Sequence, residues 1–571
     1  MKFLEKIENL INERIIKLGA DEKVNLSFSD RPELSDFQTN VAFSLSKTLR
    51  KAPISIANEI AQDLETDEFE IFAVAPGFVN VKLKDKMFSS ILKELFYDQR
   101  CGIEKVEKKN IFIDYGGPNI AKPLHVGHLR SAIIGETLKR LCKFVGNDVT
   151  SDVHLGDWGL QMGLVIAGIL EKYDCTYFFT GEGEKPCFNF EELAGIYPES
   201  SARSKVDEQF KLKAKEITVK LQNKEKGYYD LWEEMRKISI EDIKKIYKVL
   251  KIDFDLWKGE SDSEPYVEKV FEILNRNNLI EKSEGAEIVK VEKETDTSPM
   301  PPLIVRSSAG AELYATTELA TIISRIENYN PQQIVYLTDN RQSLHFNQVF
   351  RACELAKIGE TTKFTHITFG TVNGQDGKPF KTRDGGIMCL SDLINLVKDA
   401  CRNKLLESQK IEKNQIELLA EQIGVSALKF GDMINYPAKD YVFDVPKFCS
   451  FEGKTGPYMQ YSIVRINSIL EKAGNFEPSF EIFGDESREV IINLMKFAKD
   501  VVGAYKEFAP NIFVQSAFNL ASSFSSLYNK TKILTEIDEN KRNSLLTLIK
   551  TVGNSLEIFA NLLAIDIPNK M

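Results

Sequence analysis

Residues 111–128 read IFIDYGGPNIAKPLHVGH, and this stretch decides the fold. Its first three residues are apolar and predict a short buried strand that ends at Asp114. A loop rich in Gly and Pro follows, and apolar residues then recur at helical spacing from Leu129 to Phe144, before Gly146. In doubly wound α/β folds such a loop lies at the carboxyl edge of the sheet, where ligands bind.

The turn HVGH at residues 125–128 has the chemistry of a phosphate site. A helix start presents unpaired N–H groups and the positive end of a dipole, and both favour anions. His125 and His128 lie three residues apart, so both imidazoles face one side and can donate to phosphate oxygens. Gly127 leaves room for an adenine. The alternatives are a metal-binding pair or a purely structural helix cap, and we favour a site that binds ATP and activates a carboxylic acid.

The bulk composition describes a cytoplasmic protein of about three domains. A chain of 571 residues exceeds the size of one core. No apolar run approaches membrane-spanning length, and the first 19 residues predict an amphipathic helix instead of a signal peptide, so we expect no membrane association. The eight cysteines form no CxxC or CxxH pair, which predicts no zinc site. A net charge of −10 argues against indiscriminate polyanion binding but allows a local basic face for one RNA.

Apolar patterns along the chain predict an α/β core between two flanking domains. A strand at 149–153 completes one βαβ unit, and 334–337, 348–357 and 367–369 form a second. The charged segment between them, about 171–262, is expected to be an inserted helical region. Residues 1–90 predict a small α/β domain with a helical stretch at 37–50, 105–422 the central domain, and 423–571 an α-helical bundle.

A second basic loop reads GKPFKTRDGG at residues 377–386. Lys378 and Lys381 lie among glycines, which suits a mobile loop that neutralises a developing pyrophosphate. Basic loops are common on protein surfaces, so this loop is informative only together with HVGH.

The two signatures together resemble the HIGH and KMSKS motifs of class I aminoacyl-tRNA synthetases. The surrounding residues resemble the arginyl-tRNA synthetases, in the order GPNIAKPLHVGHLRS (117–131), HLGDWGLQMG (154–163), ELYATTELA (312–320), DNRQSLHF (339–346) and GPYMQYS (456–462). The resemblance implies a Rossmann-like catalytic domain, an N-terminal domain that binds the tRNA D-loop and a C-terminal anticodon-binding bundle. It also implies a monomer that joins L-arginine to tRNA(Arg) through arginyl-adenylate and releases AMP and pyrophosphate.

The same resemblance assigns the small-molecule site. Asn119, His125 and Gln342 are expected to hold the arginine backbone and carboxylate, while Asp114, Tyr314 and Glu318 face its side chain. A planar guanidinium calls for carboxylates and an aromatic hydroxyl. The family commonly has Asp where this chain has Glu318. His125, Gly127, His128 and Lys381 are expected to bind ATP, and His125, His128, Lys122, Lys378 and Lys381 to be catalytic, with Mg²⁺ carried by the phosphates and no metal held by the protein.

For tRNA, the resemblance implies that Phe78 and Asn80 stack on and hydrogen-bond a D-loop base. The residues matching anticodon-loop contacts are Tyr461, Arg465, Phe524, Tyr528 and Met571. From spacing alone, core packing is the better interpretation of Phe524 and Tyr528, which lie four residues apart on one helical face.

Three other functions stay open on the residues alone. One is a class I synthetase with another specificity, although cysteine or methionine enzymes would not place Asp114 and Glu318 in the pocket. Another is a small HxGH nucleotidyltransferase, which would not need the helical last third. The third is a catalytically silent tRNA-binding protein, against which the retained HVGH, Lys122 and KPFKT argue.

Overall fold

The computed structural model describes residues 2–308, 310, 312–378, 380, 388–407 and 412–571. It divides into two compact units. The first comprises Met1–Glu104, Ser462–Val502 and Gln515–Phe559, and the second comprises Lys105–Tyr461, Gly503–Val514 and Ala560–Met571.

A four-stranded parallel sheet forms the centre of the second unit. Its strands are β5 (Asn110–Asp114), β6 (Asp148–Asp152), β10 (Gln333–Asp339) and β11 (Lys363–Phe369), in the order β11-β10-β5-β6. The chain leaves β5 toward β6 on one side, and β10 leads to β11 on the other. The crevice at the carboxyl ends of β5 and β10 is therefore a topological switch point, where open α/β sheets bind ligands.

Helices cover the sheet as the two predicted βαβ units require. Helix α5 (Val126–Phe144) connects β5 to β6, and α13 (Ser343–Ala356) connects β10 to β11. Phe112, Ile334 and Tyr336 pack with apolar residues of α13 and of α12 (Tyr314–Tyr329) in one buried cluster. The strand and helix predictions for residues 111–113, 129–144, 334–337 and 367–369 are thus confirmed.

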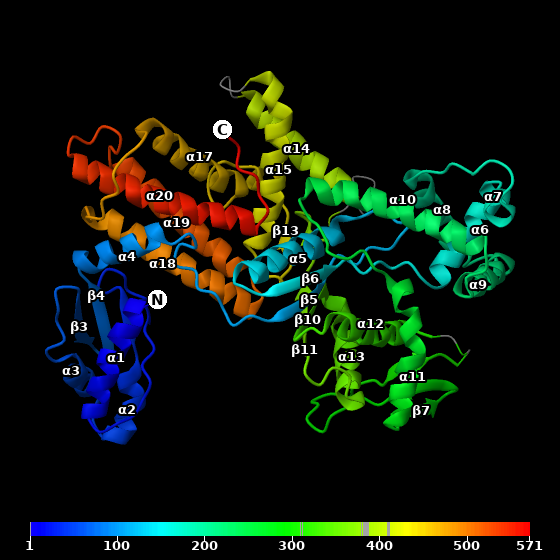
Figure 1. Cartoon of the computed structure of the whole chain (residues 1–571), viewed down its shortest axis with the longest axis horizontal. Helices are drawn as coiled ribbons and strands as arrows, with labels where there is room; N and C mark the ends of the chain where they lie inside the picture. Colours follow the sequence, from blue (N-terminus) through cyan, green and yellow to red (C-terminus); the bar gives the residue numbers. More distant parts are fainter. Residues whose placement is uncertain (1, 309, 311, 379, 381–387, 408–411) are drawn as a thin grey trace. The chain divides into compact units, whose positions relative to one another are not determined.

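The predicted helical insertion is also present. It contains α7 (Thr176–Thr180), α8 (Phe190–Arg203), α9 (Glu208–Gln222) and α10 (Tyr228–Val249), and follows α6 (Leu160–Lys172). Helices α6 to α9 all pack on α10, the longest of this group (Figure 1).

After the insertion lies a segment that the sequence analysis did not anticipate. The 3₁₀ helix η1 (Glu260–Tyr266) and α11 (Val267–Arg276) lead into an antiparallel sheet of β7 (Ile280–Ser283), β8 (Ala286–Val289) and β9 (Leu303–Arg306). The rest of this unit contains α14 (Leu390–Glu407), α15 (Ile416–Met433) and α16 (Val445–Phe448). A two-residue β13 (Tyr441–Val442) pairs with β12 (Val372–Asn373). Among the residues described, β13 is the one strand beyond residue 423, and helices joined by loops make up the rest.

The first unit combines a small antiparallel sheet with a helical bundle. The sheet has the order β1-β2-β4-β3, from β1 (Ser27–Phe28), β2 (Phe37–Thr39), β3 (Phe69–Val74) and β4 (Phe78–Leu83). Its helices are α1 (Lys2–Lys17), α2 (Val41–Leu49), α3 (Pro53–Ala61) and α4 (Asp85–Tyr97). The predicted helical stretch at 37–50 was wrong at its start, because residues 37–39 pair with β4 before α2 begins.

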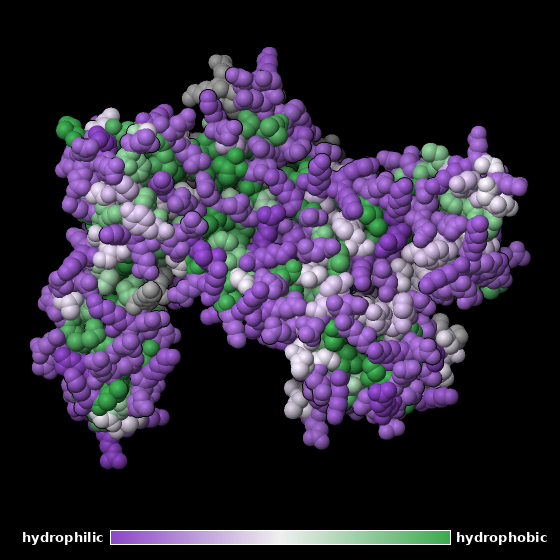
Figure 2. Space-filling view, in the orientation of Figure 1, coloured by the Kyte–Doolittle hydropathy of each residue, from purple (hydrophilic) through white to green (hydrophobic). Residues whose placement is uncertain are grey.

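The long C-terminal helices follow the predicted periodicity. They are α17 (Gly456–Ala473), α18 (Gly484–Glu507), α19 (Asn511–Lys530) and α20 (Glu539–Leu562). No helix among the residues described is long and apolar enough to cross a membrane. Hydrophilic side chains cover most of the face shown in Figure 2.

A buried ion pair fastens α5 to α15 within the second unit. The Arg130 guanidinium lies 3.0 Å from the Asp432 carboxylate, and the two side chains are 1% and 0% exposed. Arg130 also donates to the Lys439 carbonyl, and the Tyr441 hydroxyl donates to Asp432. The pair thus holds the helix that carries HVGH at its start.

We expect Asp432→Ala to destabilise the second unit by about 3–5 kcal/mol, since the substitution leaves a buried guanidinium unpaired. The chain's three tryptophans, Trp158, Trp232 and Trp257, all lie in this unit, so urea unfolding followed by tryptophan fluorescence reports on it. Lys269→Ala, which breaks an exposed pair with Glu327, is the control and should cost about 1 kcal/mol or less. Equal shifts for the two variants would contradict the role given to Arg130.

Candidate active site

A cavity of about 330 Å³ opens at the carboxyl ends of β5 and β10. Residues from six segments line it. We call the part around His125 and His128 the mouth, and the part around Asp114, Glu260 and Glu318 the acidic end. The lining residues that the argument uses are Asp114, Asn119, His125, Gly127, His128, His154, Gly156, Glu260, Tyr314, Glu318, Asp339, Arg341 and Gln342. The cavity therefore lies at the position that the sheet topology predicts.

The two imidazoles at the start of α5 cap the helix as well as facing the cavity. The Gly127 backbone N–H donates to Nδ1 of His125 (3.1 Å), and the His125 backbone N–H donates to Nδ1 of His128 (3.0 Å). A neutral imidazole whose Nδ1 accepts a hydrogen bond carries its proton on Nε2. Both rings are therefore Nε2–H donors, and their centroids are 3.9 Å apart.

Both histidines are neutral near pH 7. Burial, together with the positive charges of Lys122 and Arg341, lowers the pKa of His125. Burial and the neighbouring His125 and Lys122 lower the pKa of His128 to about 3. The mouth of the cavity thus offers hydrogen-bond donors without a permanent charge on either ring.

Two glycines make these contacts sterically possible. A Cβ at Gly127 would lie 2.8 Å from Cε1 of His125, so this glycine serves the histidine cap directly and is not needed only for an adenine. A Cβ at Gly156 would lie 2.0 Å from Oδ1 of Asn119, so the absence of a side chain at Gly156 leaves room for the Asn119 amide beside the cavity. Side chains larger than hydrogen at either position would displace a residue that lines the cavity.

A buried charge network underlies the acidic end. Nη2 of Arg325 lies 2.6 Å from Asp114 and 3.1 Å from Asp152. Nδ1 of His154 lies 3.8 Å from Asp152. Burial opposes protonation of His154, but its interaction with Asp152 and the charges of Asp114 and Glu318 outweigh the effect of burial and raise its pKa to about 9. His154 is therefore cationic at neutral pH, unlike the two histidines at the mouth.

Two further carboxyl groups complete this end. Glu318 is buried, and its Oε2 atom has no hydrogen-bond partner among the described residues. Burial and the charge of Asp114 raise the pKa of Glu318. Burial raises the pKa of Glu260 to about 7, with contributions from Asp157 and Glu318. Tyr314, one helical turn before Glu318, stacks on His345 at 4.5 Å.

Most of the predicted small-molecule residues come together in this cavity. Eight of them line it, namely Asp114, Asn119, His125, Gly127, His128, Tyr314, Glu318 and Gln342. Asp114 lines the cavity, and it also forms an ion pair with the internal Arg325 that the sequence analysis did not predict. Glu260 and Glu318 line the cavity without an ion pair to any described residue.

The lysines predicted to be catalytic do not line the cavity where the structure describes them. The amine of Lys122 lies over the Tyr197 ring, 5.9 Å from its centroid, and Lys122 does not line the cavity. Lys378 is exposed in a turn, and Lys381 lies outside the described residues. The Val126 backbone N–H donates to the Met388 carbonyl (3.1 Å), so the chain returns from the loop directly beside HVGH.

Sequence reasoning missed Asp152, His154, Glu260 and Arg325. Asp152 could have been found, because it follows the predicted strand that begins at Val149, as Asp114 follows the predicted strand at 111–113. In the sheet the two aspartates lie in register. Arg325 lies seven residues after Glu318 on α12, hence on the same helical face. For His154 and Glu260 no spacing in the sequence indicates that they meet this cavity.

The residues matched to tRNA contacts lie in two units. In the first unit, Phe78 is half-buried and packs on Phe43 at 5.3 Å, and Asn80 is buried with Oδ1 unpartnered among the described residues. Phe524 is fully buried, which leaves its ring no exposed face for a base. Tyr528 is 37% exposed beneath the guanidinium of Arg465, 5.0 Å from the ring centroid. Tyr461 and Met571 belong to the second unit.

Among the residues described, no group of three or more His, Cys, Asp or Glu side chains is arranged to hold a metal ion. Seven of the eight free cysteines are buried or half-buried, and Cys187 is exposed.

Known proteins match the chain over its whole length. The family model of the class I (R) tRNA synthetase catalytic domain matches residues 90–445, the arginyl-tRNA synthetase N-terminal domain 5–83, and the DALR anticodon-binding domain 459–571. The arginine–tRNA ligase of Alkaliphilus oremlandii is 43% identical over 100% of this chain and 99% of its own. That of Agathobacter rectalis is 42% identical, with 100% of both chains covered.

Solved structures share the fold. The arginyl-tRNA synthetase of Plasmodium falciparum has a TM-score of 0.83 and 24% identity, covering 100% of this chain and 99% of its own. That of Thermus thermophilus has a TM-score of 0.81 and 21% identity, covering 100% of both. The sequence relationship to the ligases, together with the geometry above, leads to one conclusion: the chain belongs to the arginyl-tRNA synthetase family of class I aminoacyl-tRNA synthetases.

Proposed function

We propose that the chain is an active arginine–tRNA ligase. It activates L-arginine with ATP to arginyl-adenylate, then transfers the arginyl group to the 3′-terminal adenosine of tRNA(Arg), with release of pyrophosphate and AMP. The observation that carries the proposal is the buried Glu318 carboxyl group, which lines the cavity and whose Oε2 atom has no hydrogen-bond partner among the described residues. An unpaired buried carboxylate is costly, and a guanidinium guest would pair with it.

The charges at the acidic end favour a cationic guest. Asp114, Asp152 and Glu318 supply three carboxyl groups, and Arg325 and His154 supply two cations. Glu260 adds a fourth carboxyl group that ionises near pH 7. The carboxyl groups therefore outnumber the cations by one when Glu260 is protonated and by two when it is ionised, which favours a cationic guest. The planar fork of donors on a guanidinium can reach two carboxylates at once, which a lysine ammonium does less well.

The opposite end of the cavity suits ATP and the reacting carboxylate. We propose that Asn119, His125 and Gln342 hold the arginine backbone, and that His125, Gly127 and His128 meet the ATP phosphates. The Nε2–H groups and the helix N-terminus would stabilise charge that develops at the α-phosphate. Lys122, Lys378 and Lys381 would neutralise the pyrophosphate, and Mg²⁺ would arrive on the phosphates rather than on protein ligands.

The reaction needs no covalent intermediate with the enzyme. An arginine carboxylate oxygen attacks the α-phosphorus, and the bond from that phosphorus to the bridging oxygen breaks as pyrophosphate leaves. A ribose hydroxyl of the terminal adenosine then attacks the arginyl carbonyl, and AMP leaves. Positioning and electrostatic stabilisation supply the catalysis.

The remaining assignments belong to the same proposal. Phe78 and Asn80 would contact the D-loop, and Tyr461, Arg465, Tyr528 and Met571 the anticodon loop. Phe524, being buried, would support Tyr528 and not touch RNA itself. We also propose domains at 1–90, 105–422 and 423–571, a monomeric state and a cytoplasmic location.

The direct test is aminoacylation of tRNA(Arg) by the purified chain, offered each amino acid separately. Arginine alone should be attached. A parallel pyrophosphate-exchange assay with tRNA omitted shows whether activation waits for tRNA. Attachment of a different amino acid would exclude the arginine specificity, and tRNA binding without attachment would favour the catalytically silent alternative.

Glu318→Gln should raise the KM for arginine about 10- to 100-fold, because it replaces a charge-assisted hydrogen bond with a neutral one. The KM for ATP should not change. Glu327→Gln is the matched control, since Glu327 is an exposed residue of the same helix and pairs with Lys269. The comparison uses steady-state aminoacylation. An unchanged arginine KM in Glu318→Gln would refute the guanidinium assignment.

Arginine should bind more tightly as pH rises from about 6 to 8. The pKa of Glu260 is raised to about 7, so this group is mostly protonated at the lower pH and anionic at the higher one, while His154, with a pKa of about 9, stays cationic. A cation prefers the ionised carboxylate, so binding releases a proton below pH 7. Calorimetric titration of arginine across this range should show the trend, and Glu260→Gln should abolish it. A flat profile for the unmodified chain would show that Glu260 does not face the ligand.

His128→Gln should lower kcat about 100- to 1,000-fold, the usual effect of removing one donor aimed at a developing charge. A glutamine at this third helical position still accepts the His125 backbone N–H, so the helix start is retained. Thermal unfolding serves as the control and should change little. Full activity of a folded His128→Gln protein would show that this ring is only a cap.

A further inference from the structure

Among the residues described, Arg341 is the one lysine or arginine that lines the active-site cavity. It lies just after β10, in the 3₁₀ helix η2 (Asn340–Gln342), at the carboxyl edge of the sheet. The described lysines expected to act on ATP lie elsewhere, since the amine of Lys122 lies over the Tyr197 ring and Lys378 is exposed in a turn. Arg341 therefore brings to the cavity a permanent positive charge that neither of these lysines supplies.

A carboxylate holds the Arg341 side chain in a fixed direction. Nε of Arg341 donates to Oδ1 of Asp339 (2.8 Å) and Nη2 donates to Oδ2 (2.9 Å), so the two planar groups meet edge to edge. The Arg341 backbone N–H also donates to Oδ1 (2.9 Å). Asp339, which lines the cavity as well, thus orders both the turn and the guanidinium.

The turn that carries Arg341 is itself anchored within the second unit. Nδ2 of Asn340 donates to the Ala438 carbonyl (3.2 Å), and Oγ of Ser343 donates to the Asn340 carbonyl (2.7 Å). A guanidinium that is already paired, on a turn that is already anchored, loses little conformational freedom when a ligand arrives. Such preorganisation favours binding.

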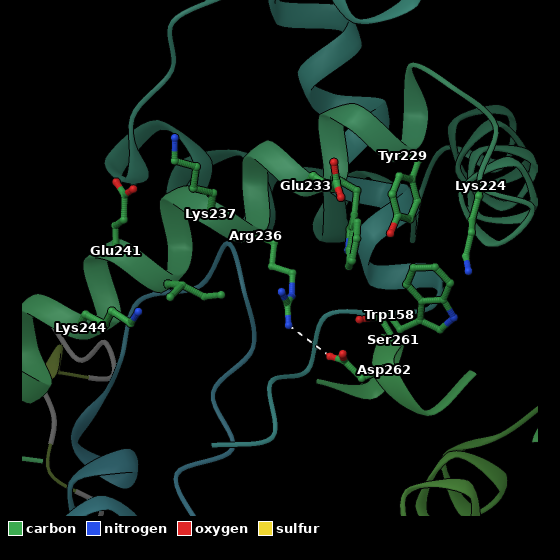
Figure 3. Close-up of a pocket in the computed structure, with 12 residues that line it drawn as sticks. Trp158, Lys224, Tyr229, Glu233, Arg236, Lys237, Glu241, Lys244, Ser261 and Asp262 are labelled. Carbon is green, nitrogen blue, oxygen red and sulfur yellow. Dashed lines mark hydrogen bonds and ion pairs between the residues drawn. The ribbon is translucent and has the colours of Figure 1, made fainter. Parts of the chain in front are cut away.

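The pairing with Asp339 leaves part of the guanidinium unused. An arginine has five side-chain N–H donors, of which Asp339 takes two, and Nη1 donates to no residue described. The Arg341 side chain is 85% exposed. In the pocket shown in Figure 3, Arg236 is the opposite case, because it is 24% exposed and donates to the two carboxylates of Asp157 and Asp262. Arg236 thus serves the fold, whereas Arg341 keeps three donors for a ligand.

Stability of the fold does not account for the Arg341–Asp339 pair. An exposed ion pair contributes little to the free energy of unfolding. The charge of Arg341 acts instead on the mouth of the cavity, where it contributes, with Lys122, to the lowered pKa of His125. Two cations therefore act on the helix start that we propose to meet the ATP phosphates.

The most negative group that would come to the mouth is the triphosphate of ATP. The arginine side chain is a cation and belongs at the acidic end, so it gains nothing from Arg341. A guanidinium matches phosphate oxygens with parallel hydrogen bonds, and an exposed one at the rim can stay with a group that leaves toward water. The β- and γ-phosphates, which leave together as pyrophosphate, fit this description.

We propose that Arg341 is a catalytic residue that binds the β- and γ-phosphates of ATP and stabilises pyrophosphate as it forms. This inference rests on the proposed function. Nη1 and the free N–H of Nη2 donate to the phosphate oxygens, and Asp339 is a positioning residue that acts through Arg341. As the bond from the α-phosphorus to the bridging oxygen breaks, its electron pair stays on that oxygen, and the guanidinium offsets the negative charge that pyrophosphate gains.

Ligands that differ in these phosphates test the contact without any reaction. Calorimetry measures the Kd of the unmodified chain and of Arg341→Gln for ATP and for pyrophosphate, both with Mg²⁺, and for AMP and arginine. The substitution should raise the Kd of ATP and of pyrophosphate about 10- to 100-fold, because it removes charge-assisted hydrogen bonds. The Kd of AMP and of arginine should not change.

The matched control is Arg203→Gln. Arg203 is an exposed arginine of α8 that pairs with Glu171 and Asp207 and does not line the cavity. This variant should keep all four dissociation constants. Arg341→Lys retains the charge without the paired fork, so it should raise the Kd of ATP by only about 3- to 10-fold.

A double-mutant cycle tests the positioning role of Asp339. Asp339→Asn retains an oxygen for the Arg341 backbone N–H but loses the ion pair, and it should raise the Kd of ATP about 3- to 10-fold. In the Arg341→Gln chain the same substitution should add nothing, because Asp339 acts through Arg341. Additive losses would contradict that role.

Two results would overturn the proposal for Arg341. One is an unchanged Kd of ATP in Arg341→Gln, and the other is an equal loss of affinity for AMP, which lacks the β- and γ-phosphates. Because binding needs no reaction, the expected pattern of dissociation constants in a chain that attaches no arginine would refute only the proposed function.

Discussion

The cavity depends on the buried contact of one guanidinium with two carboxylates. Asp114 and Asp152 end neighbouring strands in register, so the sheet brings two carboxylates together away from water. Left alone, the two carboxylates would repel each other. Arg325 lies 2.6 Å and 3.1 Å from them, and this fixes the rotation of α12 about its axis. Glu318 and Tyr314 lie on the same helix face, so the same ion pair aims them at the cavity.

The ion pair with Arg325 changes the role that the sequence suggests for Asp114. Its position at the end of β5 suggests a carboxylate for the substrate, yet its charge is largely used inside the protein. In the function proposed above, the selective charge comes from Glu318, whose Oε2 atom has no hydrogen-bond partner among the described residues, and from Glu260 of η1. The longer Glu318 side chain is compatible with this geometry, because the site draws on two carboxyl groups that approach from different elements instead of on one short aspartate.

The sequence predicts those elements that depend on residue patterns within a short segment of chain. The strand before Asp114, the helix start at His125 and the chain order of the two βαβ units all follow from short apolar periods and from glycine. It was insufficient where distant segments meet. His154 and Glu260 lie 106 residues apart by number, and only the packing of η1 against the loop after β6 brings them to one cavity. The β7–β9 sheet escaped prediction because its first strand, IEKS, is short, charged and largely exposed.

The two ends of the cavity differ in charge for a chemical reason. At the mouth, burial keeps His125 and His128 neutral, so they can donate to phosphate oxygens without binding pyrophosphate as tightly as two cations would. At the other end, nearby carboxylates keep His154 charged although it is buried. One residue type therefore serves opposite ends of one site. A substrate with a cationic side chain and a reactive carboxylate would match this polarity in one orientation, with its carboxylate toward the start of α5, where we propose that nucleotide phosphates bind.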